Sequence, residues 1–249
     1  MKKSVVITGG SKGIGLELVK FYAEKGFKVI SGSRTKYDDF NAAIKANIQE
    51  IIMDVTNPES HEELVNEAIK QTGKLDVYIN NAGFSEWRSL QNIDAKFLES
   101  MFSTNVFGYF WGTKAAAKVM NPGSSIINIS SLAARRGTPN NSAYSSSKFA
   151  ITGLTQSIAK ELGKSGIRVN AICPVLIETP GLIEALKSED APSFGQPTEF
   201  LEEFALTQTA LGRLPNSKDV AELCYFLTSE SANAITGQSI NVDCGVLPN

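Results

Sequence analysis

The feature that most constrains the fold is the regular alternation of short apolar runs with helical patterns along the chain. The apolar runs predict seven strands, at Ser4–Thr8, Lys28–Ser31, Ile48–Met53, Leu75–Asn80, Ser125–Ser130, Ile167–Cys173 and Ser239–Val242. Helices are predicted between them, near Gly15–Lys25, Tyr37–Ala46, Pro58–Gln71, Asp94–Met120, Ala143–Lys164 and Ser217–Ser229. Repeated β-α-β units give a parallel sheet, and right-handed crossovers place helices on both faces. We therefore expect one Rossmann-type α/β domain over residues 1–249, with a doubly wound, parallel, seven-stranded sheet.

Composition excludes several classes of protein. Hydrophobic residues make up 42% of the chain, and no apolar run approaches the ~20 residues that span a bilayer. The N-terminus enters an apolar run too short for a signal peptide, so we expect a cytoplasmic protein with no membrane association. The net charge of −2 argues against general nucleic-acid binding.

Histidine and cysteine usage excludes further chemistry. The single histidine, His61, rules out a multi-histidine metal site, and we expect no metal. It lies beside Glu62 and Glu63 in a polar helical stretch, so we expect it on the surface. The cysteines are odd in number and widely spaced, which predicts free, buried thiols at Cys173, Cys224 and Cys244.

A glycine-rich turn, Thr8–Gly15, lies between the first predicted strand and helix. Its spacing is neither G-x-G-x-x-G nor that of a P-loop. Glycines nevertheless allow the backbone to approach a pyrophosphate, and a helix N-terminus offers it free N–H groups. The turn therefore predicts a dinucleotide site, with contacts from Gly9, Ser11, Lys12, Gly13, Ile14 and Gly15.

The residues after the second strand bear on the choice of nucleotide. A carboxylate there would bind the ribose hydroxyls of NAD, but this chain has Ser33 and Arg34. Arginine presents paired donors to a phosphate, and Lys12 supplies a second cation. We expect a 2′-phosphate pocket, and hence NADP(H), rather than two solvated surface cations. Asp54 and Val55, after the third strand, are expected to contact adenine.

Tyr144 and Lys148 are four residues apart in a predicted helix and share one of its faces. A phenol titrates near ~10, and a neighbouring cation lowers that pKa. The pair therefore predicts a general acid/base. The spacing alone also occurs by chance on exposed helix faces.

Further motifs show that the chain resembles the short-chain dehydrogenase/reductase family from Ser4 to about Gly245. Asn80–Gly83 looks like the family's N-N-A-G motif, in which Asn81 lines the cofactor. Ser131 precedes Tyr144 by the expected thirteen residues. The resemblance implies a catalytic tetrad of Asn105, Ser131, Tyr144 and Lys148.

The resemblance also implies a role for each of these residues. Tyr144 would donate a proton to a carbonyl oxygen that Ser131 orients. Lys148 would lower the pKa of Tyr144 and, with Tyr144, contact the nicotinamide ribose. Asn105 would hold a water through its helix backbone. Ile177 and Thr179 lie where the family binds the carboxamide end of the cofactor.

Two departures from the family pattern and one irregular segment stand out. Val175 replaces a usual glycine after the sixth strand, and a left-handed backbone there would strain valine. Cys244 replaces a common glycine near the C-terminus. An insertion at about 175–214, with a short helix near Thr198–Leu206, is expected to form a substrate lid. The alternatives for the insertion are an oligomer contact or an ordered surface loop.

The expected function is NADPH-dependent reduction of a small-molecule ketone or aldehyde by hydride transfer. Leu211–Asp219 and Ile235–Gln238 look most like 3-oxoacyl-carrier-protein reductases. The alternatives are an NAD(P)+-dependent alcohol or sugar dehydrogenase and a nonenzymatic NADP-binding interaction protein. A homodimer or homotetramer is implied, with one long helix carrying Phe102, Phe107, Tyr109, Phe110 and Trp111 into the core or an interface.

Each of two residue pairs near the predicted pocket has two possible roles. Trp87 and Arg88 either face the substrate or anchor a loop. Arg135 and Arg136 are predicted to be a solvated pair rather than a contact for an anionic substrate or carrier.

Overall fold

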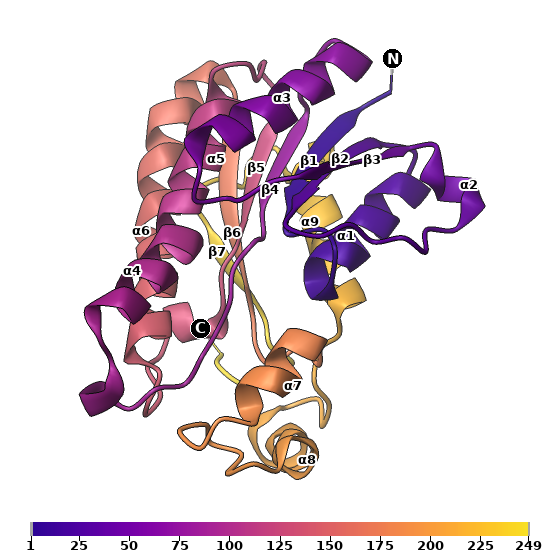
Figure 1. Cartoon of the computed structure of the whole chain (residues 1–249). Helices are drawn as coiled ribbons and strands as arrows, with labels where there is room; N and C mark the ends of the chain where they lie inside the picture. The colour runs from indigo at the N-terminus through magenta and orange to yellow at the C-terminus, as the bar shows by residue number, and fades with distance from the viewer. Residues whose placement is uncertain (1, 249) are drawn as a thin grey trace.

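The computed structural model describes residues 2–248 and contains a parallel sheet in the order β3-β2-β1-β4-β5-β6-β7 (Figure 1). Each neighbouring pair of strands is parallel. The strands are β1 (Ser4–Thr8), β2 (Lys28–Ser33), β3 (Ile48–Ile52), β4 (Val77–Asn80), β5 (Ser125–Ile129), β6 (Arg168–Pro174) and β7 (Ser239–Val242). The predicted doubly wound, seven-stranded sheet is therefore confirmed. The strand order reverses between β1 and β4, which is where ligands bind in open α/β sheets.

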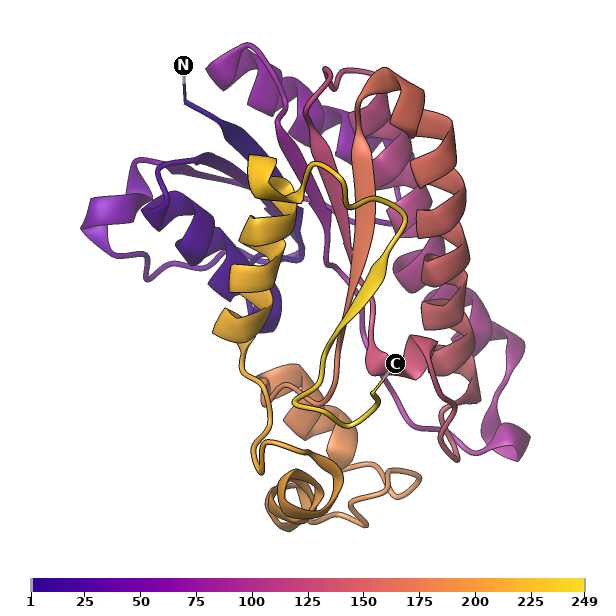
Figure 2. The ribbon, with the colours of Figure 1, turned by 180° about the vertical axis from the view of Figure 1, so that it is seen from behind.

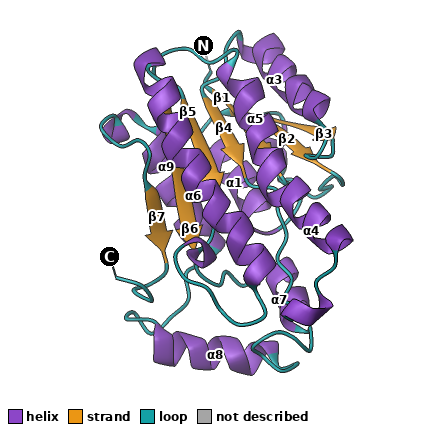
Figure 3. Ribbon diagram, turned by 90° about the vertical axis from the view of Figure 1, so that its left-hand side faces the viewer, coloured by secondary structure: helices purple, strands orange, loops and turns teal. Residues whose placement is uncertain are grey.

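Helices cover both faces of the sheet. Helices α1 (Gly13–Glu24) and α9 (Ser217–Thr228) pack together on one face, which Figure 2 shows from behind. Figure 3 looks onto the other face, which carries α3 (Pro58–Thr72), α5 (Gly108–Ala117) and α6 (Ser142–Leu162). The other α-helices of the described residues are α2 (Ala42–Lys45), α4 (Ala95–Phe102), α7 (Pro180–Leu186) and α8 (Pro197–Gln208). Among residues 2–248, no helix combines the length and apolar composition that crossing a bilayer requires.

Two apolar cores explain why the strands read as continuous apolar runs. Val5 and Ile7 of β1 pack toward α1 and α9, whereas Val6 between them packs toward the α3–α6 side. Successive side chains of a strand point to opposite faces, so a sheet covered on both faces needs apolar residues at every position.

Two predicted helices differ in the structure. The helix expected over Tyr37–Ala46 is reduced to α2, and the backbone N–H of Tyr37 donates to the Glu50 carboxylate on β3 at 2.8 Å. The helix expected over Asp94–Met120 is divided by a π-helical turn at Ser103–Phe107 and ends at Ala117. Such turns widen a helix locally and are frequent at functional sites.

His61 is buried, so its predicted surface position is wrong. Its side chain is 0% exposed, with Nε2 2.9 Å from the carbonyl oxygen of Val55 and Nδ1 2.8 Å from the Tyr78 hydroxyl. A carbonyl only accepts, so Nε2 carries the proton and the Tyr78 hydroxyl donates to Nδ1. Both nitrogens are thus satisfied by a neutral ring, and burial lowers the pKa of His61 below its ordinary 6.5.

We expect this histidine to make the protein less stable in mild acid. The unfolded chain takes up a proton near pH ~6.5, whereas the folded state resists protonation because the ring is buried. The free energy of unfolding should therefore be level at higher pH and fall as pH drops through about 6.5, by at most ~1.4 kcal/mol per pH unit. Urea unfolding of the wild type and His61→Gln between about pH 7.5 and 5.5 measures this slope. Equal slopes in the two proteins would contradict the assignment.

Candidate active site

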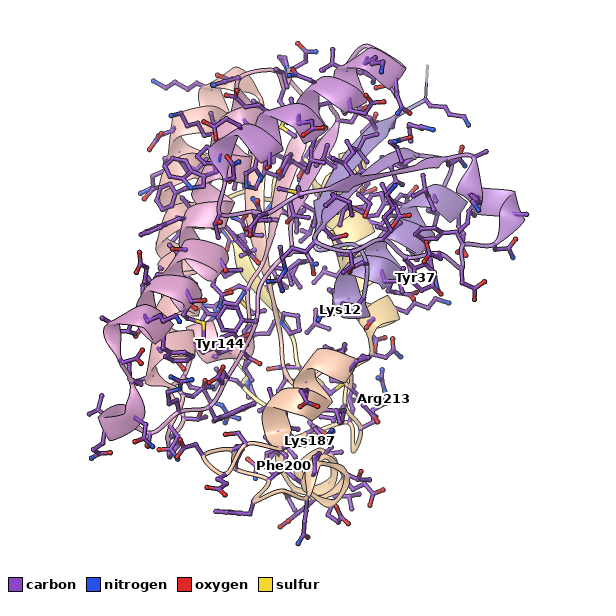
Figure 4. The ribbon with its side chains drawn as sticks, in the orientation of Figure 1. Lys12, Tyr37, Tyr144, Lys187, Phe200 and Arg213 are labelled. Atoms are coloured by element: carbon purple, nitrogen blue, oxygen red, sulfur yellow. The ribbon has the colours of Figure 1, made fainter. Side chains whose placement is uncertain are left out.

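A cavity of about 1210 Å³ opens at the carboxyl ends of the strands, between the turn after β1 and the loop after β4. Every residue predicted to contact the nucleotide lies on its wall, from Gly9 in the glycine turn to Thr179 before α7. Ser131, Tyr144 and Lys148 line the same cavity. Figure 4 shows Lys12 on the α1 side of this opening and Tyr144 on the α6 side.

The glycine turn has a backbone that side chains would obstruct. Gly9 has a φ of 72°, and a Cβ on Gly15 would lie 2.0 Å from the Gly9 carbonyl oxygen. Helix α1 begins at Gly13 with no acidic residue in its first turn. Its free N–H groups and positive end therefore face the cavity without a competing carboxylate.

Thr8 holds this turn against the loop after β4, a role that the sequence did not reveal. Its hydroxyl oxygen accepts the N–H groups of Asn81, at 3.0 Å, and Ala82, at 3.2 Å. In return, the Asn81 amide donates to the carbonyl oxygens of Thr8 and Gly9. The available signal was a hydroxyl residue at the end of an apolar strand, directly before the glycines.

The far end of the cavity, after β2, is cationic. Lys12 and Arg34 are exposed, line the cavity and form no ion pair with a carboxylate within residues 2–248. Ser33 donates to the carbonyl oxygen of Thr35 at 2.6 Å, and the hydroxyls of Thr35 and Ser11 lie 3.1 Å apart. Two cations and three hydroxyls therefore gather where a phosphate would be received.

Asp54 is held in a fixed orientation beside this end. Its Oδ1 accepts the Thr56 N–H at 2.9 Å and the Thr56 hydroxyl at 2.8 Å. The backbone bond from Thr56 contributes most to lowering the pKa of Asp54, with a smaller contribution from the charge of Arg34. Because His61 holds the carbonyl of Val55, the peptide between Val55 and Thr56 is fixed at both ends.

Lys148 lies behind Tyr144 on helix α6. Its Nζ is 5.7 Å from the centre of the Tyr144 ring. The ammonium donates to the Ile129 carbonyl oxygen at 3.1 Å and lies 3.5 Å from the Tyr109 hydroxyl oxygen. Burial lowers the pKa of Lys148 to about 8.

The expected lowering of the Tyr144 pKa by Lys148 is wrong for this structure. Burial raises the pKa of Tyr144, and the nearby Ser131 hydroxyl offsets this only in part. Tyr144 therefore carries its proton at neutral pH. Ser131 itself begins a short 3₁₀ turn and accepts the Ala133 N–H at 3.1 Å.

Asn105 supports the site from behind rather than on the cavity wall. It is 0% exposed within the π-helical turn, and its side-chain amide donates to the Phe84 carbonyl oxygen at 2.9 Å. Its Oδ1 accepts the Phe84 N–H at 3.0 Å. Asn105 thus fixes the loop at Gly83, where a Cβ would lie 3.7 Å from Nζ of Lys148. This side-chain clamp was not predicted, and the expected backbone-held water stays a prediction.

The 175–214 segment covers the other end of the cavity with helices α7 and α8. It packs around Trp87, with Leu186, Ala191 and Leu201 in the same apolar cluster. Trp87 thus both anchors its loop and lines the cavity. Helix α7 was not predicted, although Thr179 caps it and Pro180 occupies its first position, a common helix start.

Hydrogen bonds tie this segment to two neighbouring loops. Asp190 accepts the Ser89 N–H through Oδ2 at 2.9 Å, and its carbonyl oxygen accepts from Asn140 at 3.0 Å. The Asn140 carbonyl oxygen in turn accepts the Arg88 N–H at 2.7 Å. The Arg88 guanidinium pairs with Glu86, so it anchors a loop.

The predicted solvated arginine pair is also wrong. The Arg135 guanidinium is half-buried and donates to the carbonyl oxygen of Ser239. Arg136 lies on the cavity wall. The two residues therefore have different surroundings, and only Arg136 is placed to meet a ligand.

The departure from the family pattern that matters for the backbone is at Cys244. Cys244 has a φ of 52°, in the left-handed region that favours glycine. Val175 is outside that region, and its N–H extends the β6–β7 ladder by donating to Val242 at 3.1 Å. Cys173 and Cys224 are buried, whereas Cys244 is half-buried.

Comparison with known proteins agrees with this arrangement. A sequence model described as enoyl-(acyl carrier protein) reductase matches residues 9–247. The chain is 36% identical to L-2,3-butanediol dehydrogenase of Corynebacterium glutamicum, with 100% of both chains covered. It is 34% identical to an (S)-acetoin-forming diacetyl reductase of Staphylococcus aureus, over 98% of this chain and 97% of the relative.

Solved structures of similar proteins superpose over nearly the whole chain. Ligand-free aldohexose dehydrogenase of Thermoplasma acidophilum has a TM-score of 0.86 and 32% identity, over 98% of this chain and 94% of its own. ElxO with NADP bound has a TM-score of 0.84 and 31% identity, over 99% of both chains.

Proposed function

Because the chain belongs to the short-chain dehydrogenase/reductase family of oxidoreductases, we propose that it reduces a ketone or aldehyde with NADPH, with Tyr144 as the proton donor. The observation that carries the proposal is the single cavity shared by the cationic end at Lys12 and Arg34 and by the Ser131–Tyr144 wall. One cavity can therefore hold a phosphate group near the cations and a reacting oxygen near Ser131 and Tyr144.

The residues of the cavity fit a nicotinamide dinucleotide. The glycine turn lines the cavity with backbone at Gly9, Gly13 and Gly15, and the N-terminus of α1 directs its positive end there. Arg34 and Lys12 would hold a 2′-phosphate, Asp54 and Val55 the adenine, and Ile177 and Thr179 the nicotinamide end. A bound NADPH would supply the hydride.

Proton transfer is the task of the chain's own side chains. The Tyr144 phenol is protonated and can donate to the oxygen that becomes basic during reduction, while the rise in its pKa on burial is a cost that bound cofactor and substrate must offset. Ser131 is positioned to hydrogen-bond the same oxygen and orient it. Oxidation of an alcohol would instead require the phenolate, which burial disfavours. Both directions use the same residue, so the relative amounts of ketone, alcohol and the two cofactor forms decide between reduction and the dehydrogenase direction that the names of two similar proteins suggest.

We propose that residues 1–249 form one domain with the 175–214 segment as a substrate lid, and that the protein works in the cytoplasm.

We also propose that the protein assembles as a homodimer or homotetramer. Phe107, Phe110 and Phe149 are 48%, 46% and 48% exposed on the π-helical turn, α5 and α6, which pack together. Exposed apolar patches of this kind mark protein interfaces. Light scattering should report a multimer that Phe110→Asp weakens; a monomeric wild type would contradict it.

A screen with both reduced cofactors tests the activity. Diacetyl, acetoin, aldoses and a 3-oxoacyl thioester are each incubated with NADPH or NADH, and loss of the reduced nicotinamide absorbance is followed. We expect turnover of a small ketone, faster with NADPH. The alcohols are tested with the oxidised cofactors in parallel. No turnover of any compound in either direction would contradict the proposal and favour the nonenzymatic alternative.

A further inference from the structure

The 175–214 segment has a larger net negative charge than the chain as a whole. It contains seven acidic residues against two basic ones, a net charge of −5, whereas the whole chain has −2. The acidic residues are Glu178, Glu184, Glu189, Asp190, Glu199, Glu202 and Glu203. The remainder of the chain is therefore net positive, and the negative charge is concentrated on the part that covers the cavity.

The two cations of this segment are already paired. Lys187 lies 2.9 Å from Glu184, and Arg213 lies 3.1 Å from Asp219. Figure 4 shows both on the segment at the lower end of the molecule, where Phe200 is also labelled. Neither cation lines the cavity, so neither offsets the carboxylates that do.

Three of the acidic residues line the cavity, namely Glu189, Asp190 and Glu203. Glu189 and Glu203 are exposed at its rim and form no ion pair within residues 2–248. Asp190 uses Oδ2 to bind the Ser89 N–H. Arg136 is the one cation of the lining near this end apart from the buried Lys148, so the rim stays net negative among the described residues.

Aromatic and leucine side chains line much of the rest of this end, together with the uncharged polar residues Thr207 and Gln208. Trp87, Phe194, Phe200 and Phe204 line it together with leucines, whereas the cation Arg34 lies after β2 and Lys12 lies in the turn after β1. The cavity is therefore polarised, with a cationic nucleotide end and an aromatic, acid-rimmed substrate end. A rim of one sign raises the local concentration of ligands of opposite or no charge relative to like-charged ones.

We propose that the substrate is a free carbonyl compound without an anionic group, and that Glu189 and Glu203 exclude substrates delivered on phosphate-bearing carriers such as coenzyme A or phosphopantetheine. This inference rests on the proposed reductase activity. It separates this chain from the carrier-linked chemistry in the name of the matching family model.

The test uses two thioesters that share one reacting ketone. Acetoacetyl-coenzyme A is anionic, and acetoacetyl-N-acetylcysteamine is neutral. With NADPH and the full chain at low ionic strength, we expect kcat/KM to be about tenfold or more higher for the neutral thioester. The ratio should shrink toward one at ~1 M salt, because the Debye length falls to about 3 Å.

Variants assign the effect to the rim. Glu189→Gln with Glu203→Gln should narrow the ratio between the two thioesters several-fold at low salt. Glu199→Gln with Glu202→Gln is the matched control, because both residues are exposed on α8, neither lines the cavity, and the pair removes the same charge; it should leave the ratio nearly unchanged. Equal shifts from both changes would assign the selectivity to overall charge and overturn the role of the rim.

A binding readout separates this inference from the proposed activity. The chain has two tryptophans, so Trp111→Phe leaves the emission of the cavity residue Trp87 as the reporter. Ligands are titrated into the complex with NADP+, using the thioesters and then 4-oxopentanoate against its methyl ester. Weaker binding of both anions supports the inference even without turnover. Equal affinity within the pairs, including no binding of any ligand, or tighter binding of an anion would overturn it.

Discussion

Tyr144→Phe is expected to lower kcat by about 10²- to 10⁴-fold, the usual contribution of a positioned acid/base group. The substitution removes one oxygen from a half-buried ring and leaves the ring packing in place. Nucleotide affinity should therefore change little, while the proton has no donor. Steady-state turnover of the best ketone from the screen and fluorescence titration with NADPH measure the two effects.

Two control substitutions test whether the loss of turnover comes from the loss of the proton donor. Ser131→Ala should lower kcat less than Tyr144→Phe, because it removes an orienting hydroxyl and not the donor. Tyr109→Phe removes another phenol near Lys148, 3.5 Å from its Nζ, and should retain most activity. Near-normal turnover by Tyr144→Phe would refute the assignment of the acid.

Arg34→Ala is expected to weaken NADPH binding by about 10- to 100-fold and NADH binding far less. A charge-assisted hydrogen bond contributes ~1.5–3 kcal/mol, which corresponds to this range. The side chain is exposed, lines the cavity and has no carboxylate partner within residues 2–248, so its loss should cost little stability. Dissociation constants for both cofactors, measured by fluorescence titration, give the selectivity.

The matched control for this substitution is Lys36→Ala. Lys36 is an exposed cation two residues along the chain that does not line the cavity. It should change both affinities equally and slightly. A similar pattern for Arg34→Ala would show that the arginine acts through overall charge and not through a 2′-phosphate contact.

The sheet and the glycine turn were predictable because their requirements are local. A strand buried on both faces needs mostly apolar residues, as β1 shows with Val5, Val6 and Ile7 in succession and every residue buried. The turn needs glycines where a Cβ would meet backbone, as at Gly15. The order of motifs then predicted which residues would share one cavity, and Ser131, Tyr144 and Lys148 lie there together.

Other features depend on tertiary partners that sequence does not display. The stretch before α2 is not helical, and there the backbone N–H of Tyr37 donates to the side chain of Glu50 on a separate strand. The pKa of Tyr144 follows burial by the whole site, and the neighbour in the sequence pattern does not decide it. The π-helical turn around Asn105 comes with a side-chain clamp on a distant loop, which no helical periodicity encodes.

The burial of His61 could have been predicted from the sequence. Its acidic neighbours suggested a solvated position, but its spacing from Leu64, Val65 and Ala68 places it on the buried face of α3. The helical period was therefore a better guide than the charge of adjacent residues.

That same imidazole gives the protein a spectroscopic label of its own. As the chain's only histidine, it contributes the sole imidazole ring signals to an NMR spectrum, so their assignment needs no mutagenesis. Its Nε2 donates a hydrogen bond to the carbonyl oxygen of Val55. Val55 lies on the cavity wall at the end proposed for adenine. Chemical-shift changes of one resonance can thus report occupancy of that end, independently of any chemistry at Tyr144.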